Sequence, residues 1–185
     1  RLRCDWSSDV CSSDLSASEV QQAKISFIGN TYRYAFTIEI DAPVDAVLEV
    51  VTDYNNLERI NDSVVQGEII EHYNIRRLKR RMLLNHCILV FCFDLVFVED
   101  VELFDDGSIT TTILPAESNF RRGFSNWRAE AISDRTTRIS VDAEQEPDFW
   151  IPPVIGPLLF KRAFMKEVHK TAANIEREAN RVRAK

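Results

Sequence analysis

Residues 146–153 read EPDFWIPP, and a helical pattern follows them from about residue 155 to residue 183. Proline fixes φ and lacks a backbone N–H donor, so Pro152 and Pro153 end the preceding strand and are tolerated in the first turn of a helix. Apolar side chains then recur at helical spacing, with charged side chains opposite them. The apolar set comprises Leu158, Phe160, Phe164, Met165, Val168, Ala172, Ile175, Ala179 and Val182. The pattern predicts one long amphipathic helix of roughly 40 Å at the end of the chain.

Most of the sequence before this helix has the patterns of strands. Residues 32–40 alternate apolar and polar side chains, and Pro43 then opens a short helix over residues 44–51, with a second short helix continuing to Ile60. Further strands are expected over residues 64–73, 75–84, 93–104, 109–114, 123–132 and 137–145. We therefore predict an α+β, helix-grip fold, in which a curved antiparallel sheet of about six to seven strands wraps around the long C-terminal helix.

Two stretches resemble a known family. Residues 42–57, APVDAVLEVVTDYNNL, match the first-helix motif of the START-like superfamily, also called the SRPBCC or polyketide cyclase and coenzyme Q-binding group. Residues 148–153 leading into Gly156 resemble the start of the last helix in one bacterial branch. The resemblance implies one START-like helix-grip domain over residues 30–183. It does not specify the function, because lipid carriers, cyclases, hydroxylase subunits and stress sensors share this scaffold.

The first residues of the chain do not fit this domain. Residues 5–15, DWSSDVCSSDL, are neither helical nor alternating in pattern and are similar to the conceptual translation of a sequencing-library adapter. We interpret residues 1–16 as such an artefact, disordered and excluded from the fold; the alternative is a natural Ser/Asp-rich tail. The compartment is then left open by the sequence: the cytoplasm, or the periplasm if a signal peptide has been lost with the native N-terminus.

The composition excludes several classes of protein. With 185 residues, 45% hydrophobic and 28% charged, the chain is long enough for one domain with a substantial core. Its longest apolar run is too short to span a bilayer, so we expect a soluble protein. A net charge of -6 argues against general nucleic-acid binding. Five glycines without a phosphate-binding loop argue against a nucleotide enzyme, and we expect no cofactor.

The titratable residues do not form a recognisable catalytic set. His72, His86 and His169 are far apart in sequence and lack metal-ligand spacing. Paired carboxylates are common, but we expect them in solvated loops and at strand rims rather than in a cleft. These pairs are Asp105 with Asp106, Glu99 with Asp100, and Glu144 with Glu146. We therefore assign no catalytic residue and no metal site.

Apolar stripes on the strands and on the long helix supply candidates for the lining of a cavity between sheet and helix. They either line this cavity or form plain core beneath the helix. The candidates are Phe36, Ile38, Trp127, Ala129, Ile139, Val141, Phe164 and Val168. Asn126 and Arg128 have the opposite parity from Trp127, so we expect them on the outer face.

Cys87 and Cys92 lie where a hairpin turn is needed, because residues 75–104 are too many for one strand. If the turn falls at residues 88–91, the two cysteines face each other within disulfide reach, and a disulfide implies an oxidising compartment. If the segment is extended throughout, they are too far apart. Two buried free thiols remain the alternative.

One strand is basic in an otherwise acidic protein, through Arg76, Arg77, Lys79, Arg80 and Arg81. These side chains form either an electropositive patch for an anionic membrane or an acidic partner, or an edge strand that charge protects from aggregation.

Three functions remain open. The favoured one is the non-enzymatic binding or carrying of a hydrophobic small molecule, lipid or isoprenoid-like, in the cavity. The second is an enzyme of the polyketide cyclase/aromatase type. The third is a protein-interaction module with a filled interior.

Overall fold

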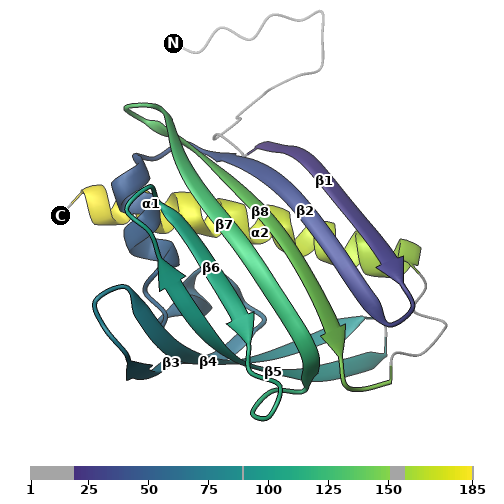
Figure 1. Cartoon of the computed structure of the whole chain (residues 1–185). Helices are drawn as coiled ribbons and strands as arrows, with labels where there is room; N and C mark the ends of the chain where they lie inside the picture. The colour runs from purple at the N-terminus through teal and green to yellow at the C-terminus, as the bar shows by residue number, and fades with distance from the viewer. Residues whose placement is uncertain (1–18, 89, 151–156, 185) are drawn as a thin grey trace, which may run out of the picture.

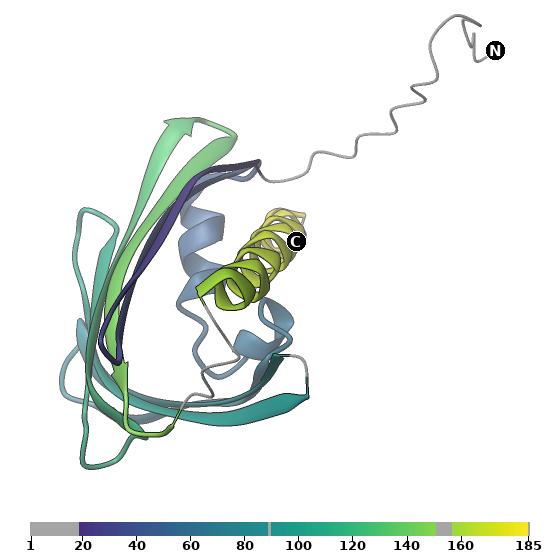
Figure 2. The same ribbon diagram turned by 90° about the vertical axis from the view of Figure 1, so that its right-hand side faces the viewer.

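The computed structural model describes residues 19–88, 90–150 and 157–184. An eight-stranded sheet curves around a long helix, which lies on the concave side of the sheet in the end-on view of Figure 2. The predicted α+β, helix-grip fold is confirmed. The segment interpreted as an artefact, residues 1–16, and the expected beginning of the long helix at residue 155 lie outside the described residues.

Hairpins build nearly the whole sheet. The strand order is β1-β2-β8-β7-β6-β5-β4-β3, with every neighbouring pair antiparallel, and only the pairing of β2 with β8 joins strands that are distant in sequence. The edge strands are β1 and β3. The bounds are β1 Glu19–Ile28, β2 Thr31–Ile40, β3 Val64–His72, β4 Arg77–Ile88, β5 Phe91–Leu103, β6 Ser108–Ile113, β7 Phe120–Ser133 and β8 Thr136–Pro147.

The strand count exceeds the expected six to seven because of β1. Its sequence, EVQQAKISFI, alternates only weakly, so the pattern of side chains does not mark it as a strand. Pairing with β2 along nearly its whole length supplies the hydrogen bonds that make it one.

The helices follow the prediction more closely. α1 covers Val44–Val51 directly after Pro43, and a 3₁₀ turn, η1, covers Leu57–Arg59. α2 covers Pro157–Arg183 and crosses behind the sheet in Figure 1. Its apolar stripe is buried at Val168, Ala172, Ile175 and Ala179. Leu158 was expected in this stripe but is 65% exposed, because the first turn of α2 lies at the end of the sheet rather than over its middle (Figure 1).

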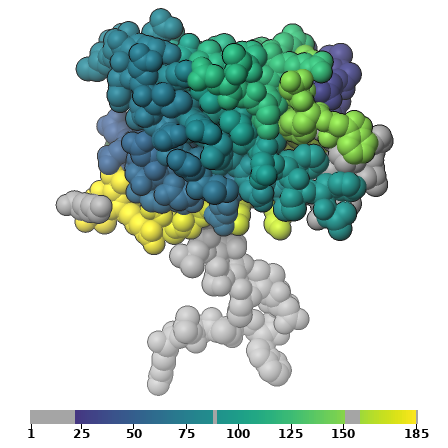
Figure 3. All heavy atoms as spheres, turned by 90° about the horizontal axis from the view of Figure 1, so that it is seen from below, coloured from purple at the N-terminus to yellow at the C-terminus, as the bar shows by residue number. Residues whose placement is uncertain are grey.

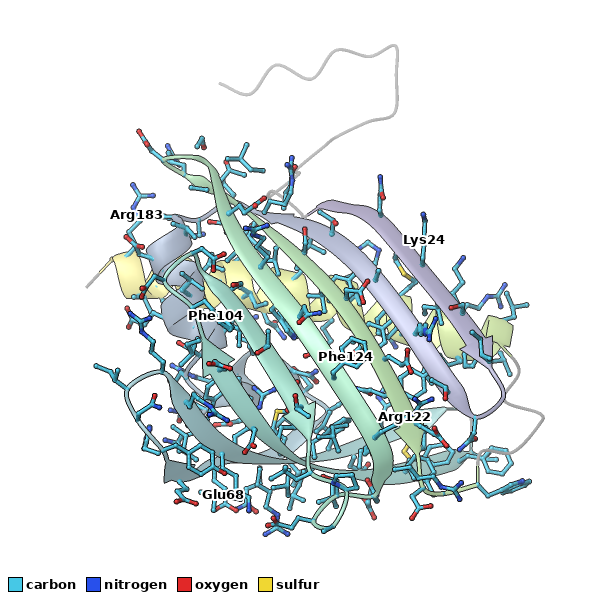
Figure 4. All side chains as sticks on the ribbon, in the orientation of Figure 1. Lys24, Glu68, Phe104, Arg122, Phe124 and Arg183 are labelled. Atoms are coloured by element: carbon cyan, nitrogen blue, oxygen red, sulfur yellow. A yellow bond between two sulfur atoms is a disulfide. The ribbon has the colours of Figure 1, made fainter. Side chains whose placement is uncertain are left out.

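The concave face of the sheet, α1 and α2 enclose the main core, which includes Ile38, Ile40, Val47 and Ile175. Viewed from below, β3, β4 and β5 cover one side of the molecule, with α2 along its margin (Figure 3). On the convex face of the sheet, which is turned toward the viewer in Figure 4, Phe104 and Phe124 are exposed beside charged side chains. The outward placement predicted for Asn126 and Arg128 is confirmed, since both are exposed.

Candidate functional site

The candidate site is a cavity in two adjacent parts between the concave face of the sheet and α2. The outer part has a volume of about 180 Å³ and the inner part about 220 Å³. They are neighbours, because the same four side chains border both. These shared side chains are Tyr34, Asn61, Leu84 and Gln145.

The outer part is apolar and its walls are largely aromatic. Phe160 and Phe164, from the first turns of α2, pack against Tyr32 and Tyr34 of β2, with ring centroids 5.3 and 4.8 Å apart respectively. The far wall includes Leu84 of β4, Phe93 of β5 and Phe149, which follows β8. The ring centroids of Phe93 and Phe149 are 5.7 Å apart. Such a wall favours burial of an apolar ligand surface.

Three polar side chains converge on the wall of this outer part. Ser63 Oγ lies 3.1 Å from His86 Nδ1 and donates to Glu167 Oε1 at 3.2 Å. In the tautomer that carries its hydrogen on Nδ1, His86 donates to the Ser63 oxygen and completes the chain. These hydrogen bonds therefore link three elements beside the cavity. Ser63 directly precedes β3, His86 lies on β4 and Glu167 lies on α2.

The inner part contains a buried ion pair. Arg80 of β4 and Glu99 of β5 are direct cross-strand partners, and Arg80 Nη2 lies 2.7 Å from Glu99 Oε2. Burial is the largest single effect on the pKa of Arg80 and would lower it. The charge and hydrogen bonds of Glu99, together with the nearby Tyr54 and Tyr34, outweigh burial, and the pKa is raised. Thr111 donates to the other oxygen of Glu99 at 3.2 Å and shares a hydrogen bond with Ser125 at 2.9 Å.

Tyrosines complete the polar lining. The Tyr32 hydroxyl donates to Gln145 Oε1, and Gln145 Nε2 donates to the Tyr34 hydroxyl at 3.4 Å. Tyr54 follows α1, and the guanidinium of Arg80 lies 4.6 Å from the centroid of its ring. Burial raises the pKa of Tyr32, Tyr34 and Tyr54, so these phenols remain un-ionised at neutral pH.

The apolar residues predicted to line the cavity divide between wall and core. Phe164 lines the outer part and Trp127 the inner part, where its indole N–H donates to Ser125 Oγ at 3.1 Å. Phe36 packs edge-on against both rings, with centroids 5.9 Å from Phe164 and 6.3 Å from Trp127. The other predicted residues are buried in the core, namely Ile38, Ala129, Ile139, Val141 and Val168.

Most of the polar lining was not predicted from the sequence. Glu99 and Glu144 were expected in solvated positions, whereas their exposed fractions are 3% and 9%. Glu167 was expected on the solvent side of α2 and His86 outside any site, although both line the outer part. A signal for Glu99 was available, since it shares the inward parity of Phe97 and Val101.

The interpretation of the basic strand was wrong in one respect. β4 lies between β3 and β5, so it is not an edge strand. Arg80 points into the cavity, while Arg76, Lys79 and Arg81 have carboxylate partners in Asp105, Glu117 and Glu68. The guanidinium of Arg77 lies 5.9 Å from the Tyr73 ring centroid. The five side chains therefore do not form one basic surface.

The hairpin of β4 and β5 turns between Ile88 and Phe91, the first of the two alternatives considered. Cys87 and Cys92 are opposite each other, their Cα atoms are 3.9 Å apart and their sulfur atoms are bonded. Both cysteines are exposed on the outer side, while the neighbouring pair, His86 and Phe93, lines the cavity.

In residues 19–88, 90–150 and 157–184, no group of three or more His, Cys, Asp or Glu side chains is arranged to hold a metal ion. No helix in this part of the chain is both long and apolar enough to cross a membrane.

Comparison with known proteins gives a family match. The model of the family described as polyketide cyclase / dehydrase and lipid transport matches residues 32–180. No curated protein matches the sequence.

Solved structures with the same fold are similar over most of their length. The aromatase/cyclase Zhui from Streptomyces sp. R1128 has a TM-score of 0.65 at 15% identity, over 82% of this chain and 94% of its own. A START superfamily protein from Mycobacterium smegmatis has a TM-score of 0.64 at 18% identity, over 81% and 98%. The STAR-related lipid transfer protein from Xanthomonas axonopodis has a TM-score of 0.64 at 13% identity, over 86% and 99%. At these identities the likeness shows the fold alone.

Proposed function

This chain belongs to the polyketide cyclase / dehydrase and lipid transport family, and from that premise we propose that it binds and carries a hydrophobic, lipid or isoprenoid-like molecule. The observation that supports this most directly is the aromatic outer part of the cavity, which adjoins an inner part that holds polar groups. Together the two parts reach the lower end of the range of ligand sites, about 300–1,000 Å³. A filled interior, which the interaction-module hypothesis requires, has no support from this cavity.

We propose that the ligand enters at the end of the molecule where α2 begins. The β1–β2 turn, the β4–β5 turn and the first turn of α2 lie at this end in Figures 1 and 2. They carry exposed apolar side chains, with exposed fractions of 62% for Ile28, 87% for Val90 and 65% for Leu158. Exposed apolar side chains beside an apolar cavity suit exchange of a hydrophobic molecule.

The test is native mass spectrometry of protein extracted without detergent, followed by identification of the bound molecule. Ala163 lines the outer part, so Ala163→Trp should fill it and abolish co-purification. Ala173 is exposed on the same helix, so Ala173→Trp is the matched control and should retain the bound molecule. Protein that carries no small molecule, and binds none when mixed with extracted lipids, would refute the proposal.

A second candidate function is a cyclase/aromatase-type enzyme, and the cluster of Ser63, His86 and Glu167 beside the cavity favours it. A neutral imidazole nitrogen can act as a general base, so His86 would accept a proton from a bound polyketide while Ser63, itself held by Glu167, orients its ring. Incubation with a poly-β-ketone analogue distinguishes the two functions. Turnover that His86→Gln abolishes indicates the enzyme, whereas binding without turnover indicates the carrier.

A further inference from the structure

Within the described residues, the buried hydroxyl of Tyr54 in the wall of the inner part has no hydrogen-bond partner. The residue is 2% exposed and lines the inner part, and its oxygen has no hydrogen-bond partner among the side chains and backbone of residues 19–88, 90–150 and 157–184. Buried hydroxyls are normally paired, because desolvation without a hydrogen bond costs stability. An unpaired hydroxyl in a cavity wall therefore points to a partner on the ligand.

The polar neighbours of Tyr54 are already engaged with one another. Arg80 donates from Nε and Nη2 to Glu99 at 3.0 and 2.7 Å, and Thr111 donates to the remaining oxygen of Glu99. The positive charge of Arg80 is thus matched inside the protein. An anionic ligand group would have to compete with Glu99 for this charge, whereas an uncharged oxygen only needs a donor.

Close contacts on both its backbone and its ring hold Tyr54 in place. Gly67 of β3 lies so close that a Cβ atom there would collide with the Tyr54 carbonyl oxygen. The guanidinium of Arg80 lies over the Tyr54 ring, 4.6 Å from its centroid, and so packs against the side chain. Because burial raises the pKa of Tyr54, its hydroxyl keeps its hydrogen at neutral pH and acts as a donor.

We infer that Tyr54 donates a hydrogen bond to an uncharged oxygen, carbonyl, ether or hydroxyl, at the inner end of the ligand, while the apolar remainder occupies the outer part. This inference rests on the proposed function and narrows it to apolar molecules with a neutral oxygen at one end. Such a contact selects between ligands of equal shape, because a hydrocarbon leaves the buried donor unpaired.

The experiment uses three probes of similar shape: 2-acetylnaphthalene, the isosteric hydrocarbon 2-isopropenylnaphthalene, and the charged 2-naphthoate. Calorimetric titration of the wild type should give affinity for the ketone about fivefold above that for the hydrocarbon, with 2-naphthoate weakest. Tyr54→Phe should reduce the preference for the ketone to within about twofold. The matched control is Tyr73→Phe, which removes an exposed hydroxyl bonded to Asp100 at 2.9 Å and should leave the preference intact.

A second measurement excludes a purely structural role. Without ligand, Tyr54→Phe should melt at the wild-type temperature or up to about 4 °C above it, because it removes an unpaired buried hydroxyl. A lower melting temperature would show that the hydroxyl has a partner within the protein and would overturn the inference. Equal affinity of the wild type for ketone and hydrocarbon would overturn it while leaving cavity binding intact. Failure of all three probes to bind would overturn the proposed function and this contact together.

Discussion

Arg80 and Glu99 face each other across neighbouring strands, and two nitrogens of the guanidinium donate to the same carboxylate oxygen, Oε2. Their side chains are only 11% and 4% exposed. Each charge thus depends on the other, because water does not solvate either of them well.

Glu99→Gln should therefore be strongly destabilising. It leaves the charge of Arg80 buried without compensation, and we expect the free energy of unfolding to fall by roughly 3–5 kcal/mol in urea titrations. Asp105→Asn breaks the exposed pair with Arg76 and should cost less than about 1 kcal/mol. Similar small losses for both variants would contradict the importance of the buried pair.

Alkaline pH should unfold the protein through its buried tyrosines. Burial, with a contribution from the charge of Glu99, raises the pKa of Tyr32, Tyr34 and Tyr54 in the folded state. Below about pH 10 these phenols are neutral in both states and stability is unaffected. Above it the unfolded chain loses their protons while the folded chain retains them, so the free energy of unfolding falls with rising pH.

Absorbance at 295 nm, recorded beside circular dichroism, checks this expectation. Ionisation of the three buried tyrosines should coincide with the loss of structure, whereas exposed Tyr73 should titrate reversibly in the folded protein. If all four phenols ionised before any loss of structure, the burial of Tyr32, Tyr34 and Tyr54 would be ruled out.

The buried stripe of α2 should contribute far more stability than its exposed first turn. Ile175 is 1% exposed, and Ile175→Ala should lower the free energy of unfolding by about 2–5 kcal/mol. Leu158→Ala removes a comparable side chain that is 65% exposed and should change it by less than about 0.5 kcal/mol. Denaturant titration of both variants gives the comparison; equal effects would argue against the packing of α2 on the sheet.

Removal of the Cys87–Cys92 bond should destabilise the hairpin beside the cavity. The double variant Cys87→Ser/Cys92→Ser should lose roughly 2 kcal/mol, the entropy expected for a short closed loop. A reducing agent should lower the melting temperature of the wild type in the same way and leave the double variant unchanged. If the agent affects both proteins equally, the loss does not arise from this bond.

The fold was largely predictable because its elements carry periodic patterns. Pro43 marked the beginning of α1, and the spacing of Val168, Ala172 and Ile175 marked the buried face of α2. β1 was missed because it has little alternation and depends on pairing with β2. Periodicity reports local environment, and an edge strand with a polar sequence offers little of it.

The candidate site was harder to predict because parity gives the face of a strand but not whether that face borders a cavity or core. Ile38 and Trp127 both face inward, yet only Trp127 lines open space. Charged residues were assumed to face solvent, although Arg80 shares the inward parity of Leu78 and Met82. The cost of burying two charged side chains is offset only when strand pairing brings opposite charges into contact, and the sequence does not show which residues pair.

In the β4–β5 hairpin, the disulfide rather than the turn sequence fixes the pairing of the two strands. Residues 88–91, ILVF, contain no Gly, Pro, Asn or Asp, the residues that normally specify a tight turn. A shift of one residue in the pairing would turn one of these two strands over and move either His86 or Phe93 from the cavity to the outer surface. The bond between Cys87 and Cys92 holds the alignment that the turn residues leave unspecified. Substitutions at the tip can therefore accumulate, provided that the number of residues between the two cysteines is preserved.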